Sequence, residues 1–180
     1  TLGYNTKTEF ANILGPTDIY SGDTKIESTN GLYDTRKDQA FLNNQSTIIN
    51  NDRTITGDTL FYDKIQGIGQ GFSNVEMIDY KNKMILNADI CYYDDNLGYS
   101  HATKRALIRD YSQPDTLYLH GDSLKLYTFN INTDSVYRKA HAFKHVRFFR
   151  KDAQGVADSL VFNSLDSCLT LYQNPIIWNG

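Results

Sequence analysis

The chain has 180 residues, enough to bury a hydrophobic core without help from disulfides or metal ions. Its 13 Tyr and 9 Phe residues accompany many Thr, Asn and Asp residues, a composition that favours strands and tight turns over helices. The formal net charge of −3 gives no field that would collect nucleic acid, and no apolar run approaches the roughly 20 residues of a membrane-spanning helix. The 2 cysteines indicate neither a disulfide framework nor a metal site. We therefore predict an all-β protein without a cofactor.

One pattern recurs along the whole chain about every thirty residues. It consists of an apolar residue, a spacer, an aromatic residue or Leu, and usually an Asp or Asn. We call the place of the aromatic residue or Leu the marker position; it is held in turn by Tyr4, Tyr33, Tyr62, Tyr93, Leu126 and Phe162. A repeat of this length predicts one structural unit per copy, with each unit packed only on its neighbours.

Each copy holds a second alternating segment, at residues 46–50, 75–79, 106–110 and 146–150. Polar clusters typical of hairpin turns separate the segments, at residues 63–67, 79–83, 94–98 and 151–155. Two strands and two turns account for about thirty residues without a helix. Four copies also carry a small residue and an Asp before the marker, which we interpret as residues near strand starts rather than as catalytic groups: Gly57-Asp58, Ala88-Asp89, Gly121-Asp122 and Ala157-Asp158.

Side chains alternate along a strand, so the apolar positions of every copy fall on one face. The predicted inner face consists of Leu60, Tyr62, Val75, Met77, Cys91, Tyr93, Ala106, Ile108, Leu124, Leu126, Val146, Phe148, Leu160 and Phe162. The intervening positions are mixed, so the other face is wet. A stack of this kind has two unpaired terminal edges, which predicts joining with like units end to end.

Residues 138–151 carry the one basic cluster of the sequence, with Lys, Arg and His but no acidic residue. Alternation places Lys144 and Arg150 on the face of Val146, near the two ends of the strand. His141 and His145 would lie about 13 Å apart on one face of a strand, too far for a shared metal ion. No nucleophile, metalloprotease or phosphate-loop motif is present, so we do not expect an enzyme.

The repeated strand, as in residues 57–63, followed by a Gly/Ala-rich stretch and a strand ending in Asp79 or Asp110, resembles the OstA-like lipopolysaccharide-transport family. That family includes a soluble periplasmic bridge protein and the periplasmic domain of the outer-membrane translocon. The resemblance covers essentially the whole chain. Residues 14–17, 115–120 and 174–178 are most similar to the Bacteroidetes-type branch.

The resemblance implies a V-shaped antiparallel β-jellyroll, open at both ends, with two strands per repeat. It further implies one domain over residues 1–180, a piece of a longer periplasmic protein associated with the outer membrane. The inner face would shield lipid A acyl chains, Lys144 and Arg150 would meet its phosphates at the rim, and similar domains would join end to end. Neither nucleic acid nor a membrane span is expected. This chain departs from the pattern at Gly31-Leu32 and by an insertion at residues 128–139.

Two alternatives remain at this point. The first is a structural β-repeat assembly module whose inner face is a filled core without ligand. The second is a carbohydrate-active parallel β-helix, which predicts short rungs and carboxylates clustered in one groove. The inner width of the trough separates the first alternative from transport, because a carrier needs room for at least one acyl chain.

Overall fold

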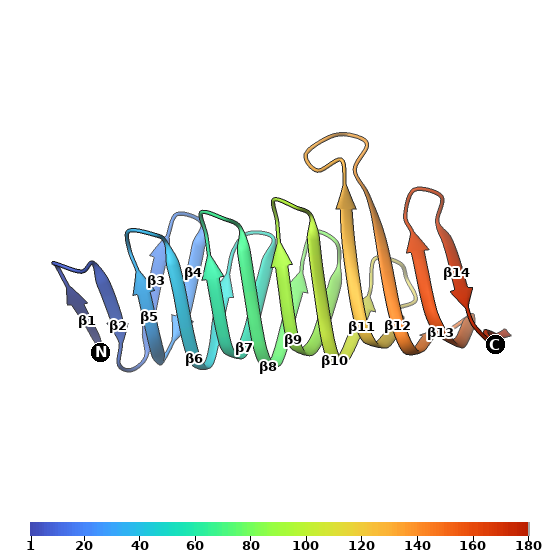
Figure 1. Ribbon diagram of the computed structural model, residues 1–180, viewed down its shortest axis with the longest axis horizontal. Helices are drawn as coiled ribbons and strands as arrows, with labels where there is room; N and C mark the ends of the chain where they lie inside the picture. Colours follow the sequence, from blue (N-terminus) through green and yellow to red (C-terminus); the bar gives the residue numbers. More distant parts are fainter. Residues whose placement is uncertain (180) are drawn as a thin grey trace.

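The computed structural model describes residues 1–179 and forms one antiparallel sheet of 15 strands (Figure 1). Gly180, the last residue of the predicted domain, lies outside the described residues. The prediction of an all-β, antiparallel, open-ended fold is confirmed, and none of the described residues forms a helix that could cross a membrane. The strands are β1 (Leu2–Asn5), β2 (Phe10–Ile13), β3 (Thr17–Ser21), β4 (Thr24–Ser28), β5 (Asn30–Asp34), β6 (Gln39–Ile49), β7 (Arg53–Asp63), β8 (Ile68–Asp79), β9 (Met84–Asp94), β10 (Tyr99–Asp110), β11 (Leu117–Phe129), β12 (Tyr137–Arg150), β13 (Ala153–Asn163), β14 (Cys168–Tyr172) and β15 (Ile176–Asn179).

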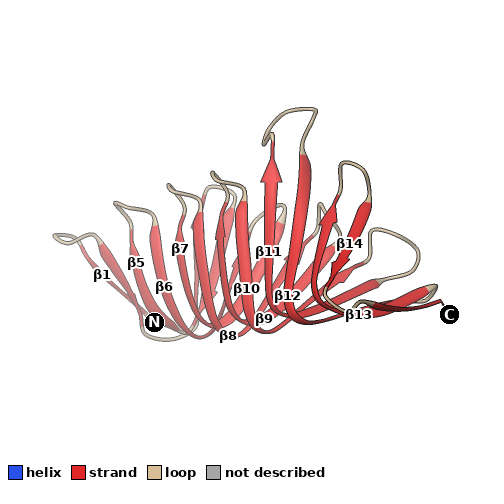
Figure 2. Cartoon of the chain, turned by 45° about the vertical axis from the view of Figure 1, so that its right-hand side comes forward, coloured by secondary structure: helices blue, strands red, loops and turns tan. Residues whose placement is uncertain are grey.

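From β6 to β13, each strand pairs with the next and is bent near its middle, so the sheet folds into two walls joined along a spine (Figure 2). The front wall contains β1, β2, β5, β14 and residues 39–43, 59–63, 68–72, 90–94, 99–103, 123–129, 137–143 and 159–163. The back wall contains β3, β4, β15 and residues 46–49, 53–57, 75–79, 84–88, 106–110, 117–121, 146–150 and 153–157. The turns at the free ends of both walls form the mouth of a trough.

The bends are built from pairs of consecutive residues in the left-handed region, with φ between 51° and 60°. The pairs are Asn44-Gln45 in β6, Ser73-Asn74 in β8, Lys104-Arg105 in β10 and Lys144-His145 in β12. Each pair interrupts the register with both neighbouring strands, as a β-bulge does. One such bend per repeat turns a flat sheet into a V.

The repeated Asp residues lie opposite these bends. Asn74 Nδ2 donates to Asp58 Oδ2 at 2.7 Å, and Arg105 forms an ion pair with Asp89. Asp122 Oδ2 lies 2.8 Å from His145 Nδ1 in the same arrangement. The interpretation as residues near strand starts is therefore wrong for Asp58, Asp89 and Asp122, because each lies at mid-strand and its carboxylate contacts the second residue of a left-handed pair.

The Asp or Asn that follows the marker position forms the turns at the mouth. Asp63 Oδ1 accepts a hydrogen bond from the Gln66 amide at 2.8 Å, and Asp94 Oδ1 accepts one from the Leu97 amide at 2.9 Å. Both carboxylates are buried. Such side-chain caps on turns explain why the marker is followed by a short polar residue.

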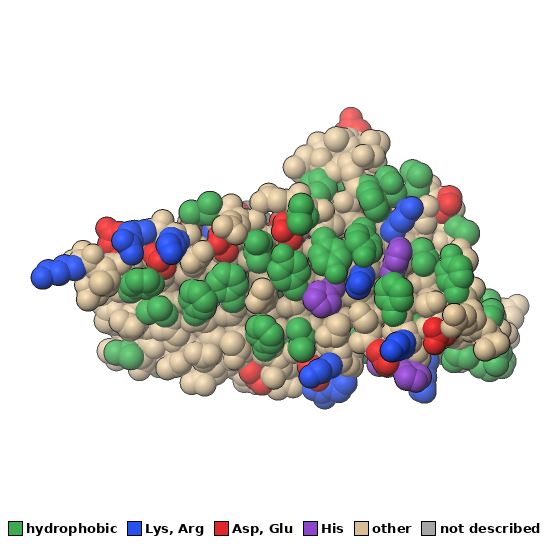
Figure 3. Space-filling view, in the orientation of Figure 1, with side chains coloured by type: hydrophobic (Ala, Val, Ile, Leu, Met, Phe, Trp, Pro, Cys, Tyr) green, Lys and Arg blue, Asp and Glu red, His purple; other side chains and the backbone are tan. Residues whose placement is uncertain are grey.

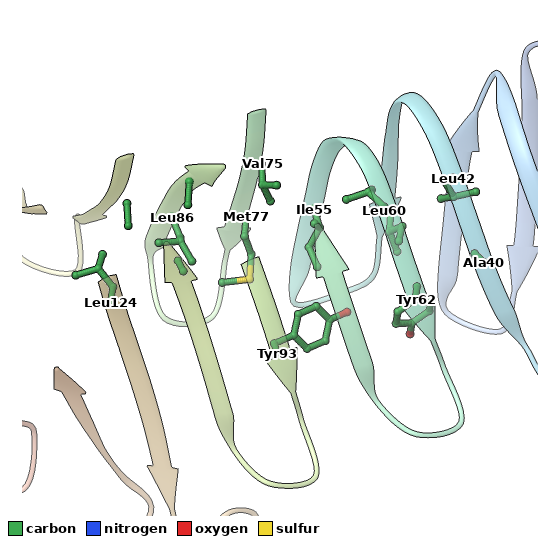
Figure 4. Close-up of a cluster of buried hydrophobic side chains, with 14 of the residues drawn as sticks. Ala40, Leu42, Ile55, Leu60, Tyr62, Val75, Met77, Leu86, Tyr93 and Leu124 are labelled. Carbon is green, nitrogen blue, oxygen red and sulfur yellow. The ribbon is translucent and has the colours of Figure 1, made fainter. Parts of the chain in front are cut away.

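The core lies between the walls, where Figure 4 shows the buried apolar side chains of successive strands. In the back wall large residues pair with large ones, as Ile55 does with Met77. In the front wall the marker residues form one cross-strand row near the mouth, in the order Tyr33, Ala40, Tyr62, Gly69, Tyr93, Ser100, Leu126, Ala140 and Phe162. The small members make room for the rings, since a Cβ on Gly69 would lie 2.2 Å from the Tyr93 ring. We call this set the marker row.

Candidate functional site

The structure brings all fourteen residues of the predicted inner face to the trough. Ten of them are buried: Leu60, Tyr62, Val75, Met77, Tyr93, Ala106, Leu124, Val146, Phe148 and Leu160. The remaining four are partly buried: Cys91, Ile108, Leu126 and Phe162. Three of these four, Ile108, Leu126 and Phe162, lie in β10–β13. We call β1–β9 the N-terminal half of the trough and β10–β15 the C-terminal half.

The N-terminal half is filled by its own side chains. Tyr33, Tyr62 and Tyr93 lie near the mouth, yet they are only 6%, 8% and 9% exposed. Burial raises the pKa of both Tyr62 and Tyr93. The cavity left between the walls beside Leu60 and Val75 measures about 20 Å³. That volume is of the order needed for one water molecule, so no acyl chain fits there while the walls stay in contact.

Polar contacts tie the two walls together at the mouth of this half. The Ser21 hydroxyl, on the β3–β4 turn of the back wall, donates to the Asp38 carboxylate of the front wall at 3.1 Å. Lys64 Nζ, from the next front-wall turn, donates to the Ser21 carbonyl and lies 3.7 Å from Asp23 Oδ1. These contacts cover the apolar core with a polar edge.

Arg53 makes the last of these connections along the chain. It starts from the back wall, and its guanidinium forms an ion pair with Asp95 of the front wall at 3.1 Å. The same group lies over the Tyr93 ring, 4.9 Å from its centroid, in a cation–π arrangement. Arg53 therefore connects the back wall at β7 to the front wall at β9 and the turn after it.

Near the mouth, the C-terminal half has different marker residues and different contacts from the N-terminal half. The marker residues are now Leu126 and Phe162, which have no hydroxyl, and both are partly buried. Within the described part of β10–β15, no hydrogen bond or ion pair joins the mouth turns of the two walls. The spine-level residues Leu124, Val146 and Leu160 stay buried. The trough therefore has a packed floor and uncovered upper walls, and Figure 2 shows the walls spreading toward the C-terminal end.

A cavity of about 490 Å³ lies at the mouth where the two halves meet, with a lining that runs from Arg53 and Tyr93 to Leu126 and Arg138. Its apolar side chains come from both halves: Met77, Met84 and Tyr93 from β8 and β9, and Leu126 and Ile131 from β11 and the turn after it. Arg53, Arg138 and several Asp and Asn side chains of the mouth turns are among its polar groups. The volume is that of a small-molecule site, and it combines an apolar base with a polar, water-facing rim.

No family model matches the sequence, and no curated protein matches it either. Among solved structures, the chain is similar to LptH from Pseudomonas aeruginosa, described as the LptA-homologous periplasmic component of the lipopolysaccharide transport device. The match covers 71% of this chain and 94% of that chain, with a TM-score of 0.57 and 9% sequence identity. This chain has an LptA-like fold. At 9% identity the similarity establishes the architecture, and the LptA-like fold agrees with the β-jellyroll that the family resemblance implied.

Of the two basic residues expected at the rim of the LptA-like trough, Arg150 lies at a strand end as predicted and Lys144 does not. Lys144 is exposed at the spine bend in the middle of β12, so its predicted place on the inner face near a strand end is wrong. The left-handed pair breaks the alternation, so Lys144 is exposed although Ala142 and Val146, two residues before and after it, are both buried. Arg150 does end β12, where Asp152 holds its guanidinium at 2.6 Å.

The two histidines of the basic cluster are also separated by this bend. His145 contacts Asp122 at the spine, whereas His141 lies in the front wall beside the Tyr127 ring. Residues 1–179 contain no group of three or more His, Cys, Asp or Glu side chains placed to hold a metal ion. The insertion at residues 128–139 extends the β11–β12 hairpin above the other turns (Figure 1).

The division of the trough into an N-terminal and a C-terminal half was not predicted from the sequence. The signal for it was present, because the marker position changes from Tyr33, Tyr62 and Tyr93 to Leu126 and Phe162. The cross-wall contacts had no such signal, since their partners lie in turns far apart in the sequence.

Proposed function

We propose that this chain is a periplasmic lipid carrier of the OstA-like family that shields acyl chains of lipopolysaccharide in the C-terminal half of its trough. The observation that carries the proposal is the replacement of tyrosine by Leu126 and Phe162, which leaves apolar wall uncovered below an open mouth. The LptA-like fold supports it, since the similar LptH is a component of a lipopolysaccharide transport device.

The physical reason for such a site is the cost of exposing acyl chains. Each methylene left in water costs about 0.8 kcal/mol, so a carrier must offer continuous apolar surface. Ile108 of the back wall and Leu126 and Phe162 of the front wall offer it in the C-terminal half. Leu60 and Val75, each 1% exposed, would join the site only if the walls separated.

The chain's further associations belong to the same proposal. Strands β14 and β15 form one terminal edge of the sheet and expose Tyr172, Ile177 and Trp178, which supports end-to-end joining with a like unit. Association with the outer membrane follows from the family resemblance alone. The Bacteroidetes-type branch stays a prediction from residues 14–17, 115–120 and 174–178. The engagement of the repeated Asp residues at the bends supports a role other than catalysis.

Site-specific photo-crosslinking tests this proposal. A photoreactive residue at position 126 should capture lipopolysaccharide, whereas one at Glu76, on the outer face of the back wall, should not. A probe at Leu60 should also stay unlabelled, because that position is buried under the closed walls. Equal capture at positions 126 and 76 would contradict an inner binding site.

A structural module without ligand is the second candidate, and the filled N-terminal half favours it. It predicts that positions 126 and 108 stay unlabelled by any lipid. The parallel β-helix alternative is excluded, because every strand pair of the sheet is antiparallel.

A further inference from the structure

The outer face of the front wall carries a continuous set of aromatic rings over β9–β12. We call Tyr92, Tyr99, His101, Tyr127, His141 and Phe143 the outer ladder. Their ring centroids follow one another at 6.3 Å (Tyr92 to Tyr99), 5.2 Å (Tyr99 to Tyr127), 5.3 Å (Tyr127 to His141) and 5.9 Å (His141 to Phe143). In Figure 3, hydrophobic and His side chains gather on the face of the molecule that is turned to the viewer.

Two lysines lie among the rings without an acidic partner. Lys125 Nζ is 5.6 Å from the Phe143 centroid, and Lys139 Nζ is 5.7 Å from that of Phe129. Neither lysine forms an ion pair with any residue in 1–179. The cross-strand partners of Lys125 are His101 and His141, so no carboxylate faces it within its row.

The imidazoles of the ladder stay uncharged at neutral pH. The pKa of His101 is lowered by partial burial and by the nearby Lys125 ammonium. The pKa of His141 is lowered by partial burial and by Lys139 and Lys125. The face thus combines aromatic rings, neutral imidazoles able to donate and accept hydrogen bonds, and positive charge from lysines alone.

This combination selects the chemistry of a ligand. Aromatic rings offer flat apolar surface, which suits the C–H faces of sugar rings, while imidazole and phenol groups suit sugar hydroxyls. Unpaired lysines require an anionic group such as phosphate or carboxylate. A purely apolar partner would leave the ammonium groups desolvated without compensation.

The position of the ladder indicates where such a ligand would come from. Tyr99 belongs to the ladder and also lines the mouth cavity together with Leu126. A headgroup that leaves the trough over the front wall would therefore pass directly onto the rings.

We propose that the outer ladder binds an acidic oligosaccharide, the phosphorylated sugar portion of a lipid whose acyl chains occupy the trough. This inference rests on the proposed function for the identity of that lipid. The acyl chains would lie on the inner side of the front wall and the sugars on its outer side, with the mouth between them.

The test uses the deacylated, phosphorylated oligosaccharide of lipopolysaccharide, titrated into the full chain by calorimetry and followed by amide NMR. Binding should perturb residues of β9–β12. Lys125→Gln and Tyr127→Ala should each weaken it by about tenfold, as expected for losing one charge-assisted or stacking contact. Phe41→Ala is the matched control, because Phe41 is an exposed ring on the same outer face, paired with Phe61 outside the ladder. That variant should bind like the unmodified chain.

Absence of oligosaccharide binding, or equal losses in the Phe41 and Lys125 variants, would overturn the proposal. Tighter binding of a single-stranded oligonucleotide of equal charge would also overturn it, as would self-association of the chain through this face. Lys125→Gln keeps the result interpretable if Tyr127→Ala fails to fold. The oligosaccharide has no acyl chains, so a lack of oligosaccharide binding says nothing about lipid capture at position 126. A lack of lipid capture at position 126 likewise says nothing about oligosaccharide binding.

Discussion

Removing the Leu60 side chain should show how tightly the N-terminal half is packed. Leu60 is 1% exposed, and its Cδ2 atom lies close to the backbone of two glycines: it is 2.9 Å from where a Cβ on Gly57 would stand and 3.3 Å from that on Gly71. Neither glycine has a side chain that could move into the space left by Leu60→Ala. A buried Leu→Ala change costs about 2–5 kcal/mol, and such poor refilling places this one at about 4 kcal/mol.

Leu126→Ala is the matched change in the C-terminal half. Leu126 is partly buried and borders the mouth cavity, so truncation loses less contact and should cost about 1–2 kcal/mol. For a chain of this length, the Leu60 variant should melt about 8–16 °C lower and the Leu126 variant only a few degrees lower.

Urea unfolding followed by circular dichroism measures both free energies of unfolding, provided that the slope of free energy against urea stays constant. Equal destabilisation by Leu126→Ala and Leu60→Ala would contradict a difference in packing between the two halves. In that case the C-terminal half would be packed like the N-terminal half and would have no uncovered wall.

Three further results are expected. Burial raises the pKa of the Cys91 thiol to about 12, so at pH 8 only the exposed Cys168 should react with a thiol reagent. Rapid modification of Cys91 in the folded chain would show that the walls separate. The pKa of His101 is lowered, chiefly by partial burial, so its contribution to the free energy of unfolding should be lost as pH falls below about 6.5. Lys125→Gln should raise the His101 pKa in an NMR titration, because it removes a nearby positive charge. An unchanged His101 pKa would exclude that charge effect. Leu126→Tyr should extend the tyrosine filling into the C-terminal half and reduce lipid capture at position 108 without loss of thermal stability, and undiminished capture would contradict that role for the marker row.

The repeat predicted the fold because its physical cause is local. Alternation of apolar and polar residues fixes which side chains face the core, and Asp63 or Asp94 after the marker fixes the turns. The two strands per repeat, the antiparallel pairing and the shared inner face of Leu60 and Phe148 all follow from these short-range patterns.

The bends could not be predicted in the same way. Left-handed backbone usually signals glycine, but these bends use ordinary residues, such as Ser73-Asn74 and Lys104-Arg105, held by contacts with the preceding strand. Extending the alternation through such a pair misplaced Lys144. Closure of the mouth also depends on distant pairs such as Arg53 with Asp95, which sequence spacing does not reveal.

The inner wall of the C-terminal half is the proposed site for the acyl chains. Intermolecular NOEs between the methylene protons of bound lipopolysaccharide and methyl-labelled, otherwise deuterated protein test it most directly. We expect NOEs to the methyl groups of Leu126 and Ile108, and none to those of Leu60. If lipid is bound but shows no NOE to any inner methyl group of the C-terminal half, the acyl chains do not lie on this wall.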